Sequence, residues 1–171
     1  MTYDPRNVIW NNSFNTYYES FYYETVADKL VDRWQIIDDI TKILVAATAS
    51  GSVISGWALW QTPDFKIVWI IIAGAGALLS IIHASLGVPS RLKDWEDVKR
   101  CFVTLKVALE TFRHRMEIDP QFPVDEYTDE YIRLRTQFGE LVPRQKNDIL
   151  LTDRLRLRAQ KEIDDKLGVT R

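Results

Sequence analysis

The residues able to do chemistry are few and widely spaced in this chain. His83 and His114 lie 31 positions apart, and the single cysteine, Cys101, has no cysteine or histidine at metal-ligand spacing. Gly74-Ala-Gly76 neither follows a predicted strand nor begins a helix, so it does not fit a dinucleotide-binding loop. No nucleophile is paired with a base in the pattern of an active site. We therefore predict that the protein is not an enzyme and needs no cofactor and no metal.

Two stripes of small and polar residues interrupt the most apolar part of the chain. Their helical spacing permits close packing of helices, with hydroxyl groups bonding across to a partner helix. Alternatively, one stripe faces an aqueous path at the centre of an oligomer. His83 would then line the path or sense pH, or it bonds to a neighbouring helix instead. The predicted pore or inter-helix stripe consists of Thr48, Ser52, Ser55, Gly76, Ser80 and His83.

Three arginines, Arg154, Arg156 and Arg158, alternate with leucines near the C-terminal end. Such a cluster could meet anionic lipid headgroups or a phosphorylated ligand. The other interpretation is a solvated helix face paired with acids such as Asp153 and Glu162.

The strongest pattern in the sequence is a long segment that is almost free of charged residues. Of 46 Asp, Glu, Lys and Arg residues in 171, only Asp64 and Lys66 lie between Ile43 and Ser90. The uncharged segments on either side of this pair each reach the roughly 20 residues that cross a bilayer. We therefore predict an all-α membrane protein, in which a two-helix transmembrane hairpin carries cytoplasmic helical extensions in an oligomeric bundle. The alternative, a hairpin buried in a soluble protein, leaves too little charged chain to cover it.

Flanking charges predict the orientation. Lys and Arg cluster before the first span and after the second, whereas the turn at 61–66 carries only Lys66, so both termini should be cytoplasmic. The predicted regions are a cytoplasmic lead and helix at 1–42, the hairpin at 43–90 with spans at Ile43–Trp60 and Ile67–Val88, and a cytoplasmic helical region at 91–171.

The flanking regions show helical spacing throughout. The first helix is predicted to begin near Tyr17, after a loop or short cap at Asp4-Pro5 and 11–13, and to continue into the first span. A break at Gly87-Val-Pro89 precedes a new helix that Ser90 can cap. Later helices are predicted near 127–141 and from about Arg144 to Leu167, with Gly168 as the stop signal.

The helix after Ser90 carries an apolar seam with steps of three and four residues, continuing to Met116. A seam of this kind needs a partner, either the apolar stripe from Tyr23 to Leu44 or a neighbouring subunit. The predicted oligomer or helix seam consists of Trp95, Val98, Phe102, Leu105, Leu109 and Phe112.

This layout resembles the SLATT domains, two-transmembrane effectors of bacterial nucleotide-signalling conflict systems. The resemblance rests on the helical lead, the hairpin, the Gly87-Val-Pro89 to Trp95 junction and the amphipathic helix that follows. It implies a homo-oligomeric effector in the bacterial inner membrane, forming a channel or membrane-disrupting assembly in antiphage defence. A partner sensor or a nucleotide second messenger would trigger it.

The partners expected are therefore a lipid bilayer, further copies of the chain and a possible sensor protein or nucleotide signal. The net charge of −2 gives no basic surface for nucleic acid, which is not expected as a partner. The alternative function is a membrane-anchored helical scaffold that docks a soluble enzyme or receptor.

Overall fold

The computed structural model describes the backbone of residues 4–58, 63–142 and 148–169, which contain five helices. Within these ranges, it describes all side chains except those of residues 47–58, 63–66, 68–69 and 72–73. The helices are α1 (Pro5–Ala58), α2 (Pro63–Leu86), α3 (Val88–Ile118), α4 (Val124–Leu141) and α5 (Asp153–Leu167). They form two compact units. Unit 1 contains Met1–Val31 and Asp94–Arg171, and unit 2 contains Asp32–Lys93, so α1 and α3 contribute to both.

Local signals define the helix ends. Asp4 Oδ1 accepts a hydrogen bond from the Arg6 amide at 2.9 Å, and Pro5 occupies the first helical position, where its missing amide hydrogen costs nothing. The Thr152 hydroxyl accepts from the Leu155 amide at 3.3 Å and starts α5. Gly168, with φ of 65°, ends α5 in the left-handed conformation that glycine adopts most readily.

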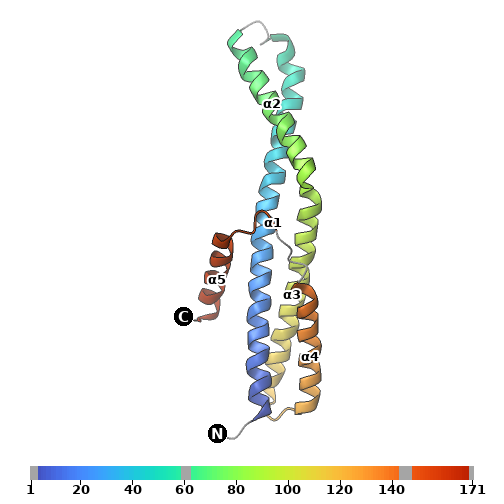
Figure 1. Cartoon of the computed structure of the whole chain (residues 1–171), viewed down its shortest axis with the longest axis vertical. Coiled ribbons are helices and arrows are strands. Elements are labelled where there is room, and N and C mark those ends of the chain that lie inside the picture. The colour runs from blue at the N-terminus through green and yellow to red at the C-terminus, as the bar shows by residue number, and fades with distance from the viewer. Residues whose placement is uncertain (1–3, 59–62, 143–147, 170–171) are drawn as a thin grey trace. The chain divides into compact units, whose positions relative to one another are not determined.

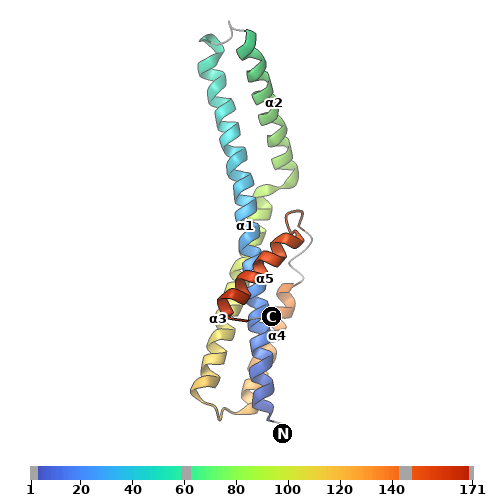
Figure 2. The ribbon, with the colours of Figure 1, turned by 90° about the vertical axis from the view of Figure 1, so that its left-hand side faces the viewer.

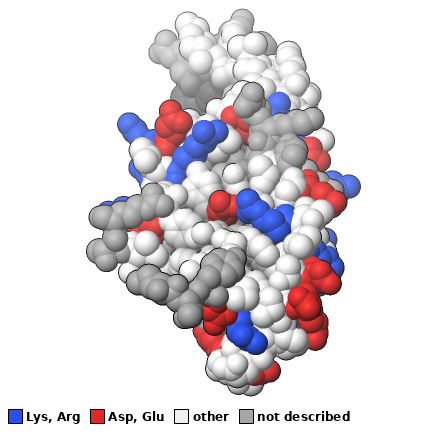
Figure 3. Space-filling model, turned by 60° about the horizontal axis from the view of Figure 1, so that its bottom comes forward, with Lys and Arg blue, Asp and Glu red and all other residues white. Residues whose placement is uncertain are grey.

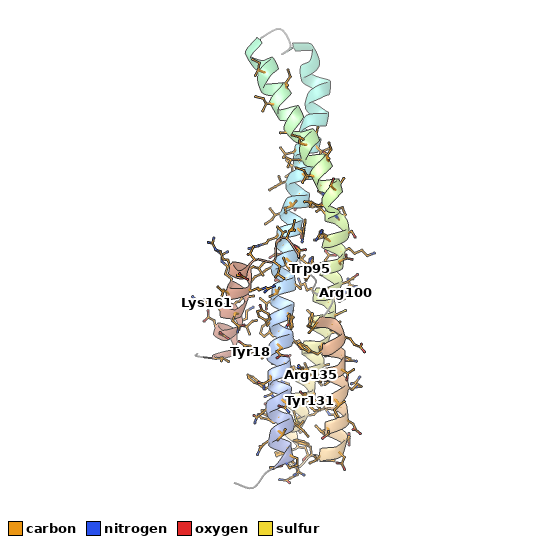
Figure 4. The ribbon with its side chains drawn as sticks, viewed as in Figure 1. Tyr18, Trp95, Arg100, Tyr131, Arg135 and Lys161 are labelled. Carbon is orange, nitrogen blue, oxygen red and sulfur yellow. The ribbon has the colours of Figure 1, made fainter. Side chains whose placement is uncertain are left out.

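Unit 1 is a helical bundle with one apolar core. The N-terminal part of α1 packs beside α3 and α4, and α5 lies against α1 (Figures 1 and 2). Tyr23, Phe102 and Phe138, one from each of α1, α3 and α4, form an aromatic cluster with ring centroids 5.4 to 6.2 Å apart. Figure 4 shows Tyr18 on the side of α1 toward α5, where its hydroxyl group bonds to Asp164.

Ion pairs join the helices of unit 1 around this core. Lys99 pairs with Asp28 and Lys106 with Glu24, in both cases with 2.5 Å between nitrogen and oxygen, and these pairs connect α3 to α1. Over the middle and lower parts of the face seen in Figure 3, charges of both signs are interspersed. This pattern is that of a surface in contact with water.

Unit 2 is a helical hairpin. The C-terminal part of α1 runs beside α2 in the opposite direction (Figure 2). At its base Trp34 and Val88 are fully buried, and the Arg91 guanidinium lies over the Trp34 ring, 5.4 Å from the centroid. Gly87, with φ of 59°, separates α2 from α3.

The predicted transmembrane hairpin is wrong. The chain is all-helical, but no helix in its described part is long and apolar enough to cross a membrane, which contradicts the spans at Ile43–Trp60 and Ile67–Val88. Small and polar residues interrupt both uncharged stretches. Ten of the 18 residues at 43–60 are Gly, Ala, Ser or Thr, and the second stretch contains nine Gly, Ala or Ser residues together with a histidine.

Three predicted helix starts also differ. α1 begins at Pro5 instead of near Tyr17, and the Asn-Asn-Ser sequence at 11–13 is helical. α3 begins at Val88, so Ser90 lies inside the helix instead of capping it. α5 begins at Asp153 instead of near Arg144, because Thr152 supplies the cap.

Candidate functional site

A buried carboxylate connects the two helices of unit 2. Asp38 of α1 has a side chain only 8% exposed. Its Oδ1 lies 2.9 Å from Nε2 of His83 on α2, and its Oδ2 lies 2.5 Å from Nζ of Lys42, one turn further along α1. The three side chains form a polar cluster, here called the Asp38 cluster, in which Asp38 and His83 are largely buried and Lys42 is exposed.

The charges in the Asp38 cluster stabilise one another. The hydrogen bond from Lys42, followed by that from His83, holds the pKa of Asp38 below its ordinary value, against the opposing effect of burial. The same bond with Asp38 raises the pKa of Lys42. Asp38 is therefore ionised at neutral pH, and it presents both carboxylate oxygens to donors.

The face of α1 that carries Asp38 buries polar groups beside the fully buried Trp34. Asp38 and Thr41 are buried, and the Thr41 hydroxyl donates to the Ile37 carbonyl at 2.8 Å. Ile36, Ile40 and Ile43, at the same spacing on another side of the helix, are all exposed. A helix on a water-soluble core normally buries its large aliphatic side chains, so the exposure of these three isoleucines indicates a further contact.

Aliphatic side chains are also exposed on α2. Gly76 is buried and His83 faces Asp38, whereas six of the described large aliphatic side chains of α2 are exposed. Together the two helices expose ten large aliphatic side chains by 41% to 67%, a set here called the apolar surface of unit 2. It consists of Ile36, Ile40, Ile43, Val45, Ile67, Ile70, Ile71, Leu78, Ile81 and Ile82.

Three members of the predicted pore or inter-helix stripe, Gly76, Ser80 and His83, have described side-chain surroundings. His83 bonds across to the neighbouring helix, which is one of the alternatives that the sequence left open. The Ser80 hydroxyl donates within its own helix, to the Gly76 carbonyl at 2.9 Å, and therefore does not use this hydrogen for a bond to α1. The side chains of Thr48, Ser52 and Ser55 lie outside the described residues.

The predicted seam residues all lie in the interior of unit 1. They pack against α1 and α4 of the same chain, as the contacts of Phe102 with Tyr23 and Phe138 show. Trp95 also donates from Nε1 to Oδ2 of the buried Asp148 at 2.8 Å. The buried seam residues are Trp95, Val98, Phe102, Leu105, Leu109 and Phe112.

Sequence reasoning missed Asp38, the central residue of the cluster. A signal was present, because Trp34, Asp38 and Thr41 follow the spacing of a helical face and are all buried. A buried acid needs a hydrogen-bond partner, and a histidine such as His83 can supply one. The two residues are 45 positions apart, so the sequence alone did not pair them.

The chemistry available to the Asp38 cluster is electrostatic. Within the described ranges, no group of three or more His, Cys, Asp or Glu residues could hold a metal ion. The cluster presents a carboxylate, an imidazole and an ammonium group that already bond to one another. Such an arrangement fixes the register of two helices.

Comparisons with protein-family models, with curated proteins and with solved structures found no match for this chain. The resemblance to SLATT domains accordingly stays a prediction.

Proposed function

We propose that the protein is an oligomeric membrane effector, in which the apolar surface of unit 2 contacts the hydrocarbon of a lipid bilayer and disrupts it as a barrier. The observation that carries the proposal is the exposure of large aliphatic side chains on unit 2. Its carboxylate and imidazole lie between the helices, whereas the ten aliphatic side chains of the apolar surface are exposed.

Water is a poor environment for this surface. Burying one large aliphatic side chain stabilises a protein by roughly 1.5–3 kcal/mol relative to leaving it exposed. Ten such side chains on two adjacent helices form the kind of apolar surface that marks an interaction site with lipid or protein. Lipid is favoured because all ten members of the apolar surface are aliphatic, whereas protein interfaces are enriched in aromatic residues and arginine.

The proposed contact is interfacial and does not require a helix to cross the bilayer. An apolar helix face can be buried among the headgroups and the first part of the acyl chains while the charged part of a protein remains in water. Lys42 of unit 2, whose side chain is 70% exposed, can reach the headgroup region from such a position.

Barrier disruption requires several copies, since one hairpin displaces little lipid. The setting in which they act is proposed on the SLATT resemblance. It consists of a bacterial inner membrane, an antiphage response, and a trigger from a partner sensor or a nucleotide second messenger.

Vesicle flotation and dye release test this function together. The purified chain should float with phosphatidylglycerol vesicles and release a trapped dye. A variant with Ile70→Asn and Ile81→Asn should lose both activities at least tenfold, because two exposed apolar contacts are replaced by amides. The matched control is Ile118→Asn in unit 1, where the isoleucine is 84% exposed but lies outside the apolar surface of unit 2.

The outcomes separate the two functions considered. Dye release that depends on Ile70 and Ile81 supports the effector. Flotation without dye release, at any protein concentration, would instead support a membrane-anchored scaffold. Equal loss in the Ile118→Asn control would show that the effect is not specific to unit 2.

A further inference from the structure

Unit 1 contains a cavity between α1, α5 and the end of α4. Its volume is about 240 Å³. Apolar side chains from Val26, Val142 and Leu151 line one part, and Tyr22, Tyr23 and Arg156 line another. The cavity therefore combines apolar contacts with two phenols and one permanent positive charge.

Arg156 is the charged residue of this cavity. Among the described residues, no acidic side chain forms a salt bridge with Arg156, and the residues that line the cavity include no Asp or Glu. Arg154 and Arg158 of the same helix do not line the cavity, because residues two apart point to different sides of a helix. Of the three arginines, Arg156 therefore lines the cavity, whereas Arg154 and Arg158 do not.

Tyr22 supplies a second polar group. Burial raises the pKa of its phenol above the ordinary value, an effect that the Arg156 guanidinium partly offsets. The phenol therefore stays protonated at neutral pH and can donate a hydrogen bond. The Tyr23 ring stands edge-on to the Tyr22 ring, with centroids 5.3 Å apart, and holds it in place.

We propose that this cavity binds a small organic anion, a carboxylate or phosphate monoester with a compact apolar body. Arg156 pairs with the anionic group, Tyr22 donates a hydrogen bond to it, and Val26 and Leu151 contact the apolar body. A volume of about 240 Å³ is below the range of about 300–1,000 Å³ typical of drug-sized ligands, which restricts the ligand to a single ring or short chain.

The site is independent of the proposed membrane activity, because all of its lining residues belong to unit 1. Calorimetric titration of the full chain with benzoate and with phenyl phosphate tests it directly. Inorganic phosphate tests the need for an apolar body, and benzyl alcohol tests the need for a charge. Saturable binding of at least one aromatic anion is expected, with both comparison compounds at least tenfold weaker.

Three variants assign the binding to the cavity. Arg156→Gln should raise the Kd at least tenfold, since it removes a charge-assisted hydrogen bond. Tyr22→Phe should raise it severalfold while keeping the ring. Arg158→Gln is the matched control, with the same charge change on the same helix, and its Kd should stay within twofold of wild type. Unchanged circular dichroism in each variant shows that the fold is retained.

Several results would overturn the proposal. These are the absence of saturable binding to either aromatic anion, equal weakening by Arg156→Gln and Arg158→Gln, or inorganic phosphate binding as tightly as phenyl phosphate. A lipid headgroup presents the same phosphate chemistry. If Arg156→Gln reduced flotation with phosphatidylglycerol vesicles but left benzoate binding unchanged, the arginine would serve lipid and the cavity proposal would fail.

Discussion

Asp38 illustrates how one buried charge can determine the packing of two helices. It accepts from His83 on the facing helix and pairs with Lys42 on its own helix, at 2.9 and 2.5 Å. Replacing Asp38 by Asn keeps the shape but removes the charge that both donors require. We expect the free energy of unfolding to fall by about 1.5–3 kcal/mol, the range for a hydrogen bond to a charged group.

Urea unfolding followed by circular dichroism measures this loss. Asp39→Asn is the matched control, because Asp39 is the adjacent residue, has the same chemistry and is exposed. Its effect should stay within about 0.5 kcal/mol, as for most surface substitutions. Equal effects of the two substitutions would show that the Asp38 cluster does not hold the hairpin together.

The same carboxylate predicts a pH dependence. The bonds from Lys42 and His83 lower the pKa of Asp38 in the folded chain, so the stabilisation is present above the ordinary pKa near 3.8 and is lost as the pH falls through the lower, folded value. Wild-type stability should therefore decrease more than that of Asp38→Asn on acidification below about pH 4. The pKa of Glu162 is also lowered, first by Lys166 and then by Lys29. Protonation of Glu162 therefore causes part of the loss of stability on acidification, and this part remains in Asp38→Asn.

Urea midpoints at pH 6, 4 and 3 for both proteins check this prediction. The difference between wild type and Asp38→Asn should shrink toward the acid end. A difference that stays constant or grows on acidification would contradict the assigned role of the carboxylate charge.

At the scale of elements, helix identity was easier to predict than helix ends. The seam from Trp95 to Met116 shows seven apolar residues at strict spacing, and the corresponding residues are buried on α3. The start of α1 was misplaced because Asn and Ser near its beginning are read as loop signals, whereas Asp4 and Pro5 form a good helix start. Tertiary packing overrides weak local preferences of this kind.

The candidate site was only partly predictable for a related reason. His83 was singled out from its place among small residues, but its partner lies on another helix. The cavity between Tyr22 and Arg156 likewise joins residues from opposite ends of the chain. The spacing of residue types along a helix indicates which face contacts another helix, but it does not identify the contacting residue on that other helix.

Gly87 provides a prediction for the junction between α2 and α3. Its φ of 59° is disfavoured for residues with a Cβ atom, although a Cβ built there would meet no described atom within 4 Å. Gly87→Ala should therefore destabilise the protein by about 1–2 kcal/mol through backbone strain alone.

Gly139→Ala is the contrasting variant, because Gly139 lies in α4 with ordinary helical φ and equally open surroundings. That change should stabilise the protein by about 0.5–1 kcal/mol. Thermal unfolding of both variants measures whether each substitution raises or lowers the stability. A stabilising Gly87→Ala would show that the left-handed turn is not required at the junction.

At the scale of the whole molecule, the two units differ in charge content and in the side chains that they expose. Unit 2 spans 62 residues but contains only nine of the 46 charged residues, and unit 1 contains the other 37. Unit 1 has a buried aromatic core with ion pairs around it, whereas unit 2 buries the Asp38 carboxylate and exposes isoleucines. This division predicts that water solubility and lipid contact can be separated.

Replacing residues 32–93 with a flexible linker of about six residues tests the separation. The linker can join the cut ends because Asp28 and Lys99, close to them on α1 and α3, are in contact at 2.5 Å. All the core residues of unit 1 remain, including Leu30, Phe102 and Ile163. The shortened chain should therefore unfold cooperatively on heating, remain monomeric in light scattering, and neither float with vesicles nor release dye. Failure to fold would show that unit 1 depends on unit 2, and flotation of a folded chain would place the lipid contact in unit 1.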